Sequence, residues 1–229
     1  MADSFHKVRG ALSLLSRGYA GAFLHEMGRQ LASVERSYAF RRDLSVSLPP
    51  PPGADAVSLR PFERGDMALL ALDNMRHKPA KAVIDRVSRI ALIASGIPSC
   101  FTAVMADGSP CFIQWLITPG ANERLRAYYK GYFPPLARDE VLLEGAFVPE
   151  AYRGRGIMAR AMWQVAERGR AMGARWAVTW VEESNVPSIR GCLACGFHPY
   201  MRKTAVRRAF RRRVSYAPLS GEERAGLGS

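Results

Sequence analysis

The chain has 229 residues, 48% of them hydrophobic, with four cysteines and a formal net charge of +13. This length accommodates one domain with an extension and a full core, and so few cysteines are typical of a reduced intracellular protein. No stretch approaches the roughly 20 consecutive apolar residues of a membrane span, and Arg17 interrupts the N-terminal apolar run, which argues against a secretory signal. We therefore expect a cytoplasmic protein that contacts a membrane only peripherally, if at all; a basic organellar presequence stays open.

Residues 1–47 carry an amphipathic pattern. Apolar side chains recur every three or four positions from Phe5 to Tyr38, which predicts one long helix or two, with a break near Gly18 and Gly21. Basic residues occupy the other faces: Lys7, Arg9, Arg17, Arg29 and Arg36. Such a helix docks on its own domain or on a second subunit, as in a homodimer, or lies on an anionic membrane surface.

A proline run over residues 48–53 separates this pattern from the rest of the chain. Consecutive prolines are stiff and cannot continue a helix, so the run is interpreted as a linker. We therefore predict a basic helical extension over residues 1–47, a linker over 48–53, a domain over 54–219 and a flexible tail over 220–229.

The first part of the domain alternates strands and helices. Strands are expected over residues 57–61, 99–105 and 111–118, and a helix over 80–94. Residues 119–138 then combine aromatic side chains with basic residues and prolines. We interpret this segment as a wall or lid of an acceptor site, with plain surface packing as the alternative.

A strand followed by a glycine-punctuated basic turn comes next. Residues 140–148 are mostly apolar and are followed by Pro149, which indicates a buried strand. The turn opens a helix that continues to Met172, and its residues are Arg153, Gly154, Arg155, Gly156, Ile157 and Met158. The first N–H groups of a helix have no intrahelical partner, and glycine lets an anion approach them. The turn therefore predicts an enzyme that uses a phosphorylated carrier.

A second motif follows the helix. Residues 175–181 are predicted to form a strand, which leads to Asn185 and Ser188 and then, after a short helix, to Gly196-Phe197. The two motifs together resemble the GNAT superfamily of N-acetyltransferases, over roughly residues 57–219. The resemblance implies an α/β (α+β) fold, with a mixed, mostly antiparallel twisted sheet and helices on both faces. It also implies acetyl-CoA as the cofactor, bound where two strands splay.

The resemblance assigns coenzyme A binding residue by residue. It places oxyanion donors at the backbone N–H groups near Phe147 and Val148, and it places the remaining contacts at Arg153, Gly154, Arg155, Gly156, Ile157, Met158, Asn185 and Ser188. Two positions depart from the family pattern. Met158 stands where glycine or alanine is usual, and Cys192 stands where many members have a tyrosine that protonates the departing thiolate.

Attack of an amine on a thioester requires a base, donors for the oxyanion and protonation of the leaving sulfur. Glu140 and Glu144 are the candidate bases, because they lie four apart on one strand and so share a face of an apolar run. The alternative is that each is a solvated or salt-bridged residue. Cys192 is the candidate acid or, alternatively, a packing residue. Cys192 and Cys195 lie at the C-terminal end of a helix, which disfavours a redox role for the pair. We expect no metal, because Cys100 and Cys111, which could complete a zinc site, lie far from that pair in sequence and belong to an ordinary strand pattern.

Seven basic residues fall between Arg202 and Arg213. Their partner could be coenzyme A, an acidic or lipid-linked acceptor, membrane phospholipid or RNA, or they could be solvated without a partner. RNA is the less favoured partner, because the chain has no nucleic-acid-binding motif. We therefore predict an acyl-CoA-dependent N-acetyltransferase acting on a primary amine of a small molecule, sugar or glycan precursor. The alternative is a catalytically degenerate binding or scaffold protein with the same fold.

Overall fold

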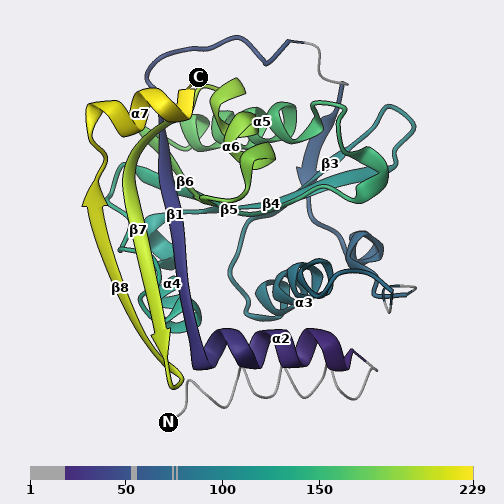
Figure 1. Cartoon of the computed structure of the whole chain (residues 1–229). Helices are drawn as coiled ribbons and strands as arrows, with labels where there is room; N and C mark the ends of the chain where they lie inside the picture. The colour runs from purple at the N-terminus through teal and green to yellow at the C-terminus, as the bar shows by residue number, and fades with distance from the viewer. Residues whose placement is uncertain (1–18, 53–55, 74, 76, 229) are drawn as a thin grey trace.

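The protein is built on one eight-stranded sheet with helices on both faces (Figure 1). The computed structural model describes residues 19–52, 56–73, 75 and 77–228. The strand order is β2-β3-β4-β5-β6-β1-β7-β8, and neighbouring strands are antiparallel except β5 and β6. This mixed, mostly antiparallel sheet is the predicted fold class.

The elements agree closely with the strands and helices expected after the linker. The strands are β1 (Ala32–Asp43), β2 (Ser58–Pro61), β3 (Cys100–Val104), β4 (Pro110–Ile117), β5 (Glu140–Phe147), β6 (Trp176–Glu182), β7 (His198–Arg208) and β8 (Arg211–Pro218). The helices are α2 (Ala20–Leu31), α3 (Ala80–Ala94), α4 (Asn122–Tyr129), α5 (Ile157–Ala171), α6 (Val186–Ala194) and α7 (Gly221–Gly228). Short 3₁₀ turns are η1 (Arg64–Leu70), η2 (Pro119–Ala121) and η3 (Glu150–Tyr152).

Two apolar layers sandwich the sheet. Helices α5 and α6 cover one face, where Met162 and Val165 of α5 pack in a core with Phe112 and Leu116 of β4. Helices α3 and α4 belong to a second core with Trp115, on the opposite face. Helix α2 does not join either core and packs on α3, as Figure 1 shows. The apolar residues of α5 that recur every three or four positions therefore form the face of the helix that is buried against the sheet.

The structure corrects the prediction for the N-terminal region. Helix ends at Leu31, and Ala32–Asp43 forms β1, which lies inside the sheet between β6 and β7. The helical prediction fails there because Val34 and Tyr38 are four apart, a spacing that fits a helix and a strand equally. Both faces of β1 are covered around Phe40, so β-sheet pairing decides its structure. The predicted helix over residues 5–18 lies outside the described residues.

The C-terminal residues are also not the flexible tail that we predicted. Gly221–Gly228 forms α7, and Arg202 of β7 pairs with Glu223 at 2.5 Å. A capping box begins the helix, because the backbone N–H of Ser220 donates to the Glu223 carboxylate and the Glu223 N–H donates to the Ser220 hydroxyl. This reciprocal pair satisfies two backbone donors and fixes the start of the helix.

Candidate active site

The two parallel strands of the sheet separate after a short stretch of pairing. Strands β5 and β6 pair only from Glu140 to Leu142 and from Trp176 to Val178. Beyond these residues β5 continues along β4 as far as Phe147, and β6 continues along β1 as far as Glu182. Beyond Leu142 and Val178, the backbone N–H and C=O groups on the facing edges of β5 and β6 no longer hydrogen-bond to each other. A linear ligand between the strands can therefore hydrogen-bond to these groups.

A bulge in β5 lies beside this opening. Glu144 pairs with Trp115 and Phe147 pairs with Ile113, so Gly145 and Ala146 face one residue of β4. Gly145 has a φ of +69°, and a Cβ there would lie 2.9 Å from the Trp115 ring, so both conformation and space favour glycine. Arg89 of α3 reinforces the bulge, with its guanidinium 3.1 Å from the Gly145 carbonyl and 2.7 Å from that of Ala146.

Glu144, the residue before the bulge, is a carboxylate set in an apolar and aromatic environment. Burial raises the pKa of Glu144, although the charges of Lys203 and Arg89 and hydrogen bonds from the Gly145 N–H and the Tyr129 hydroxyl oppose the rise. A raised carboxyl pKa moves the group toward the range in which a general base works near neutral pH. The expectation of a desolvated carboxylate on this strand is thus met at Glu144.

Glu140 differs from Glu144 in its surroundings. Its carboxylate accepts a hydrogen bond from the Ala137 N–H at 2.9 Å, in the turn that precedes β5. Glu140 also lies where β5 and β6 are still paired, opposite Trp176. This geometry favours a structural role for Glu140 and leaves Glu144 as the candidate base.

Lys203 of β7 is a functional candidate that the sequence did not single out. Its side chain is 1% exposed, and its Nζ lies 3.3 Å from the centre of the Tyr132 ring, 4.6 Å from Phe133 and 4.7 Å from Trp180. Among the described residues the ammonium has no hydrogen-bond acceptor. Burial lowers the pKa of Lys203 to about 7, against the opposing attraction of Glu144.

Two of the three aromatic residues around Lys203, Tyr132 and Phe133, come from the segment that we predicted to form a wall or lid, and Trp180 comes from β6. Phe133 is buried and packs against Trp180, with ring centres 6.2 Å apart. Strand β8 holds the segment in place, because Arg212 donates to the Tyr129 carbonyl at 2.6 Å and the Tyr216 hydroxyl donates to the Tyr132 carbonyl at 3.1 Å. The segment therefore forms a fixed aromatic wall beside Glu144.

The glycine turn lies at the N-terminus of α5, as predicted. Gly154 and Gly156 have φ values of +79° and +70°. Gly156 is the N-cap and provides no side-chain cap, and the first turn of α5 contains no acidic residue. The helix N-terminus therefore presents its N–H groups and the positive end of the helix dipole without a carboxylate to neutralise them. Ile157 is 1% exposed and anchors this end in the core.

Other residues of the predicted cofactor set connect the turn to the splayed strands. The Arg153 side chain donates to the Val148 carbonyl at 3.1 Å, next to Phe147 at the end of β5. The Arg155 guanidinium lies 5.7 Å from the centre of the Tyr152 ring. Met158 is directed toward α6, because a Cβ on Gly191 would lie 3.2 Å from its sulfur. The departure from the usual small residue at Met158 is therefore accommodated by Gly191.

Comparison with known proteins finds a family model that matches the central part of the chain. Residues 101–197 match the model of the acetyltransferase (GNAT) family. The match covers less than half of the chain, which therefore resembles this family over that part of its length. A search of curated proteins returned no match.

Solved structures share this GNAT fold. A glucosamine N-acetyltransferase region of a fungal multi-domain β-N-acetylglucosaminidase is 13% identical with a TM-score of 0.53, and the match covers 86% of this chain and 22% of that one. GNAT proteins from Colwellia psychrerythraea and Sphaerobacter thermophilus are 11% and 15% identical, with TM-scores of 0.48 and 0.47. These matches cover 84% and 85% of this chain but only 59% and 55% of the other chains.

Asn185 and Ser188 have a local structural role at the start of α6. The Asn185 side chain caps α6 by accepting a hydrogen bond from the Ser188 N–H at 3.3 Å. The cap positions the helix after β6, next to the end of the splayed strand. Cofactor contact by either residue stays a prediction.

Cys192 lies in the apolar core on the side of the sheet that α5 and α6 cover. It is fully buried, and its Sγ lies 4.0 Å from the Met162 sulfur of α5. Burial raises the pKa of the Cys192 thiol well above its ordinary value. These contacts favour the packing alternative over the role of general acid. Among the described residues, no group of three histidine, cysteine or acidic side chains is placed to hold a metal ion.

We expect substitution of Cys192 to change stability and leave the chemistry intact. Cys192→Ala should lower the unfolding free energy by about 1 kcal/mol, through loss of buried contacts. Cys192→Ser should lower it further, because the hydroxyl is buried without an assured partner. Acetyl-CoA-dependent thiol release per folded molecule and thermal unfolding midpoints check this. A rate loss in both variants with unchanged midpoints would restore Cys192 as the acid.

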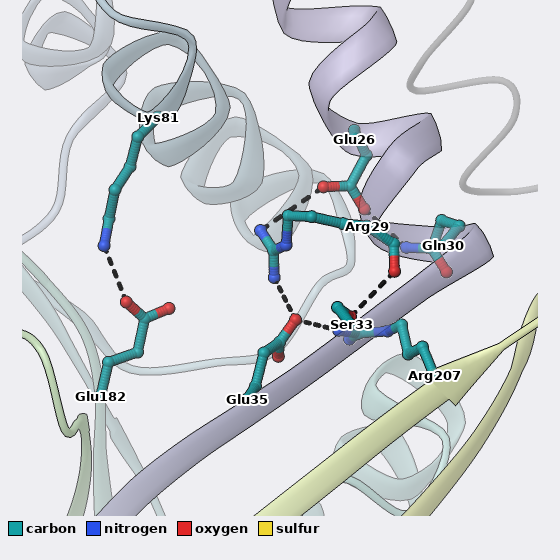
Figure 2. Close-up of polar contacts among 8 residues, drawn as sticks. All are labelled: Glu26, Arg29, Gln30, Ser33, Glu35, Lys81, Glu182 and Arg207. Carbon is teal, nitrogen blue, oxygen red and sulfur yellow. Dashed lines mark hydrogen bonds and ion pairs between the residues drawn. The ribbon is translucent and has the colours of Figure 1, made fainter.

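A polar groove adjoins the site on the side of α2 and α3. It has a volume of about 420 Å³ and is lined by His25, Arg29, Val34, Glu35, Arg36, Lys81, Ile84, Asp85, Glu182, Glu183 and Ser184. Figure 2 shows two of its ion pairs: Arg29 with Glu35, and Lys81 with Glu182 at 2.7 Å. Arg207 of β7 also pairs with Glu35, so this carboxylate holds α2, β1 and β7 together.

The cluster of seven basic residues does not form one solvated surface. Lys203 and Arg207 are buried, Arg202 pairs with Glu223, and Arg212 donates to backbone carbonyls. Arg208, Arg211 and Arg213 are exposed near the turn between β7 and β8. The alternation along the two strands therefore divides the cluster between the site and the solvent.

The described residues include no helix with the length and apolar character needed to cross a membrane.

Proposed function

We propose that this protein is an acyl-CoA-dependent N-acyltransferase that transfers an acetyl group from acetyl-CoA to a primary amine in a ternary complex. The observation that carries the proposal is the position of Glu144. This carboxylate with a raised pKa lies at a bulge beside the point where β5 and β6 separate. An uncapped helix N-terminus lies next to the same strand end.

The residues present fit the cofactor. The uncapped turn at Gly154 and Gly156 offers N–H donors to the pyrophosphate, and Arg153 and Arg155 add positive charge beside it. The unpaired edges of β5 and β6 can accept and donate hydrogen bonds to the amide groups of the pantetheine arm. Bound there, acetyl-CoA supplies an activated acetyl group as a thioester.

Groups of the protein then accept the proton of the amine and stabilise the charge that develops on the thioester oxygen. Glu144 accepts the proton that the amine must lose to become a nucleophile. Backbone N–H groups near Phe147 and Val148 are the proposed donors to the oxyanion. Because a thiol ionises near pH ~8.5, the departing thiolate is a weak base and requires little help from an acid. The burial of Cys192 is therefore compatible with turnover.

The groove is the proposed acceptor site. Nine of its eleven lining residues have polar or charged side chains, which can bond to a hydrophilic molecule. Four of its side chains are acidic in a chain of net charge +13: Glu35, Asp85, Glu182 and Glu183. Amines are cationic near neutral pH. Because Arg29 and Lys81 of the same lining already engage Glu35 and Glu182, Asp85 and Glu183 are the carboxylates that we propose attract the amine. The favoured acceptors are a small hydrophilic amine, an amino sugar or a glycan precursor.

One observation favours a second function. Cys192 is buried at the position where many family members have the acid, so a domain that binds coenzyme A without turnover is the alternative. Such a protein would serve as a binding or scaffold protein.

Two measurements test the proposal. Calorimetric titration with acetyl-CoA measures binding of the cofactor. Chromatography then detects free coenzyme A released in the presence of glucosamine, spermidine or a lysine peptide as the acceptor. We expect micromolar binding and amine-dependent release of thiol. Binding without release with any of these amines would favour the scaffold, and no binding would overturn the assignment of the cofactor. Identifying the acetylated amine by mass spectrometry completes the experiment.

A further inference from the structure

Lys203 is a buried cation with few compensating contacts. Its side chain is 1% exposed, and among the described residues its Nζ has no hydrogen-bond acceptor. The faces of Tyr132, Phe133 and Trp180 surround the ammonium at 3.3–4.7 Å and stabilise its charge in part. An ammonium in such a site still lacks most of the solvation that it has in water, so its charge depends on nearby carboxylates.

Glu144 is the carboxylate that balances the charge of Lys203. One aromatic cluster joins the two groups: Phe133, whose ring centre lies 4.6 Å from the Lys203 ammonium, packs on Tyr129 with ring centres 4.6 Å apart. The Tyr129 hydroxyl donates to the Glu144 carboxylate, and the charges of Lys203 and Glu144 attract each other. The other charges that face Lys203 are Glu35 of β1, Glu182 of β6 and Arg212 of β8. Two guanidiniums already engage Glu35, and Lys81 engages Glu182. Glu144 therefore remains as the carboxylate whose charge Lys203 balances.

Arg89, the second cation near Glu144, uses its guanidinium to bind backbone carbonyls. Arg89 donates to the backbone carbonyls of Asp85, Gly145 and Ala146. The Tyr129 hydroxyl interacts with Glu144 as well, but it carries no charge. Lys203 is thus the positive group near Glu144 whose donors are not used by hydrogen bonds among the described residues.

We propose that Lys203 is a positioning residue that holds Glu144 in its ionised form and disfavours a second ammonium beside it. This rests on the proposed function, in which Glu144 takes a proton from the acceptor amine. An acceptor that enters as an ammonium meets the like charge of Lys203, so its N–H bond breaks more readily and the proton passes to Glu144. The neutral amine then attacks the thioester carbonyl, and the C–S bond breaks to release the thiolate.

The small number of lysines allows a test that does not depend on activity. The chain has five: Lys7, Lys78, Lys81, Lys130 and Lys203. NMR titration of the full-length protein labelled at lysine Nζ should show one lysine titrating near pH 7, and Lys203→Arg should remove that signal. In Glu144→Gln its midpoint should fall by one pH unit or more, since the balancing charge is gone. An unchanged midpoint in Glu144→Gln would overturn the proposal.

Lys203→Met and Lys203→Arg form a matched pair, because both are long side chains and only arginine keeps the charge. In Lys203→Met the acid limb of kcat/KM for amine-dependent thiol release should move to higher pH, since Glu144 loses its positive neighbour. In Lys203→Arg the limb should stay close to that of the wild type. A merely structural role would lower the unfolding midpoint and leave the limb in place, which would overturn the proposal. Coupled NMR midpoints without turnover would instead contradict the proposed function alone.

Discussion

Replacing Gly156 by aspartate is expected to abolish measurable binding of acetyl-CoA, whereas Gly156→Asn should weaken it by less than about tenfold. Gly156 is the N-cap of α5 and has a φ of +70°. Aspartate and asparagine are the residues other than glycine that adopt this conformation most readily, so both variants carry a similar backbone strain. The two side chains have nearly the same size and shape, so any steric cost at this position is similar in both variants.

The difference between the two variants is therefore their charge. The aspartate carboxylate can bond to the N–H groups of the first turn and is attracted by the helix dipole, and it also repels a pyrophosphate. Asparagine can cap the same N–H groups but brings no net charge. Calorimetric titration of the three proteins at one ionic strength measures the effect. Equal affinities for Gly156→Asp and wild type would mean that the pyrophosphate binds elsewhere.

The helix N-terminus that we propose binds the cofactor could be predicted because its signals are local. A strand ended by Pro149 and a turn with Gly154 and Gly156 specify a helix N-terminus within a few residues, and the structure has α5 beginning at Ile157. The capping box at Ser220 and Glu223 was an equally local signal for α7, and the expectation of a flexible tail overlooked it.

The acceptor half could not be predicted because it depends on pairing between distant segments. Strand β1 lies beside β7, and Ser37 pairs with Lys203. No local pattern distinguishes Lys203 from its exposed basic neighbours until that pairing places it beside Trp180 and Glu144. The sequence also did not show whether Val34 and Tyr38 lie on a helix or on a strand, because their four-residue spacing fits both periodicities. Long-range pairing therefore decided what local sequence patterns left ambiguous.

Glu144→Gln is expected to reduce kcat/KM for thiol release by about 10²- to 10⁴-fold once an acceptor is known, because an amide cannot accept the proton of the amine. Acetyl-CoA binding should remain within a few-fold of that of the wild type, since Glu144 is not part of the pyrophosphate turn. Glu140→Gln is the matched control on the same strand, and it should keep most of the rate because its carboxylate serves the turn at Ala137. Wild-type rates in both variants would show that the base is another group.

Stability measurements distinguish this loss of rate from unfolding. Burial raises the pKa of Glu144 in the folded state above its ordinary value of 4.5. The folded protein therefore binds this proton more tightly than the unfolded chain, and the Glu144 contribution to the free energy of unfolding declines as the pH rises from 4.5 to the raised value. Glutamine resembles the protonated acid and escapes this decline. Glu144→Gln should accordingly be at least as stable as the wild type at pH 8, with a difference that shrinks toward pH 4. An inactive variant with that profile would locate the defect in proton transfer.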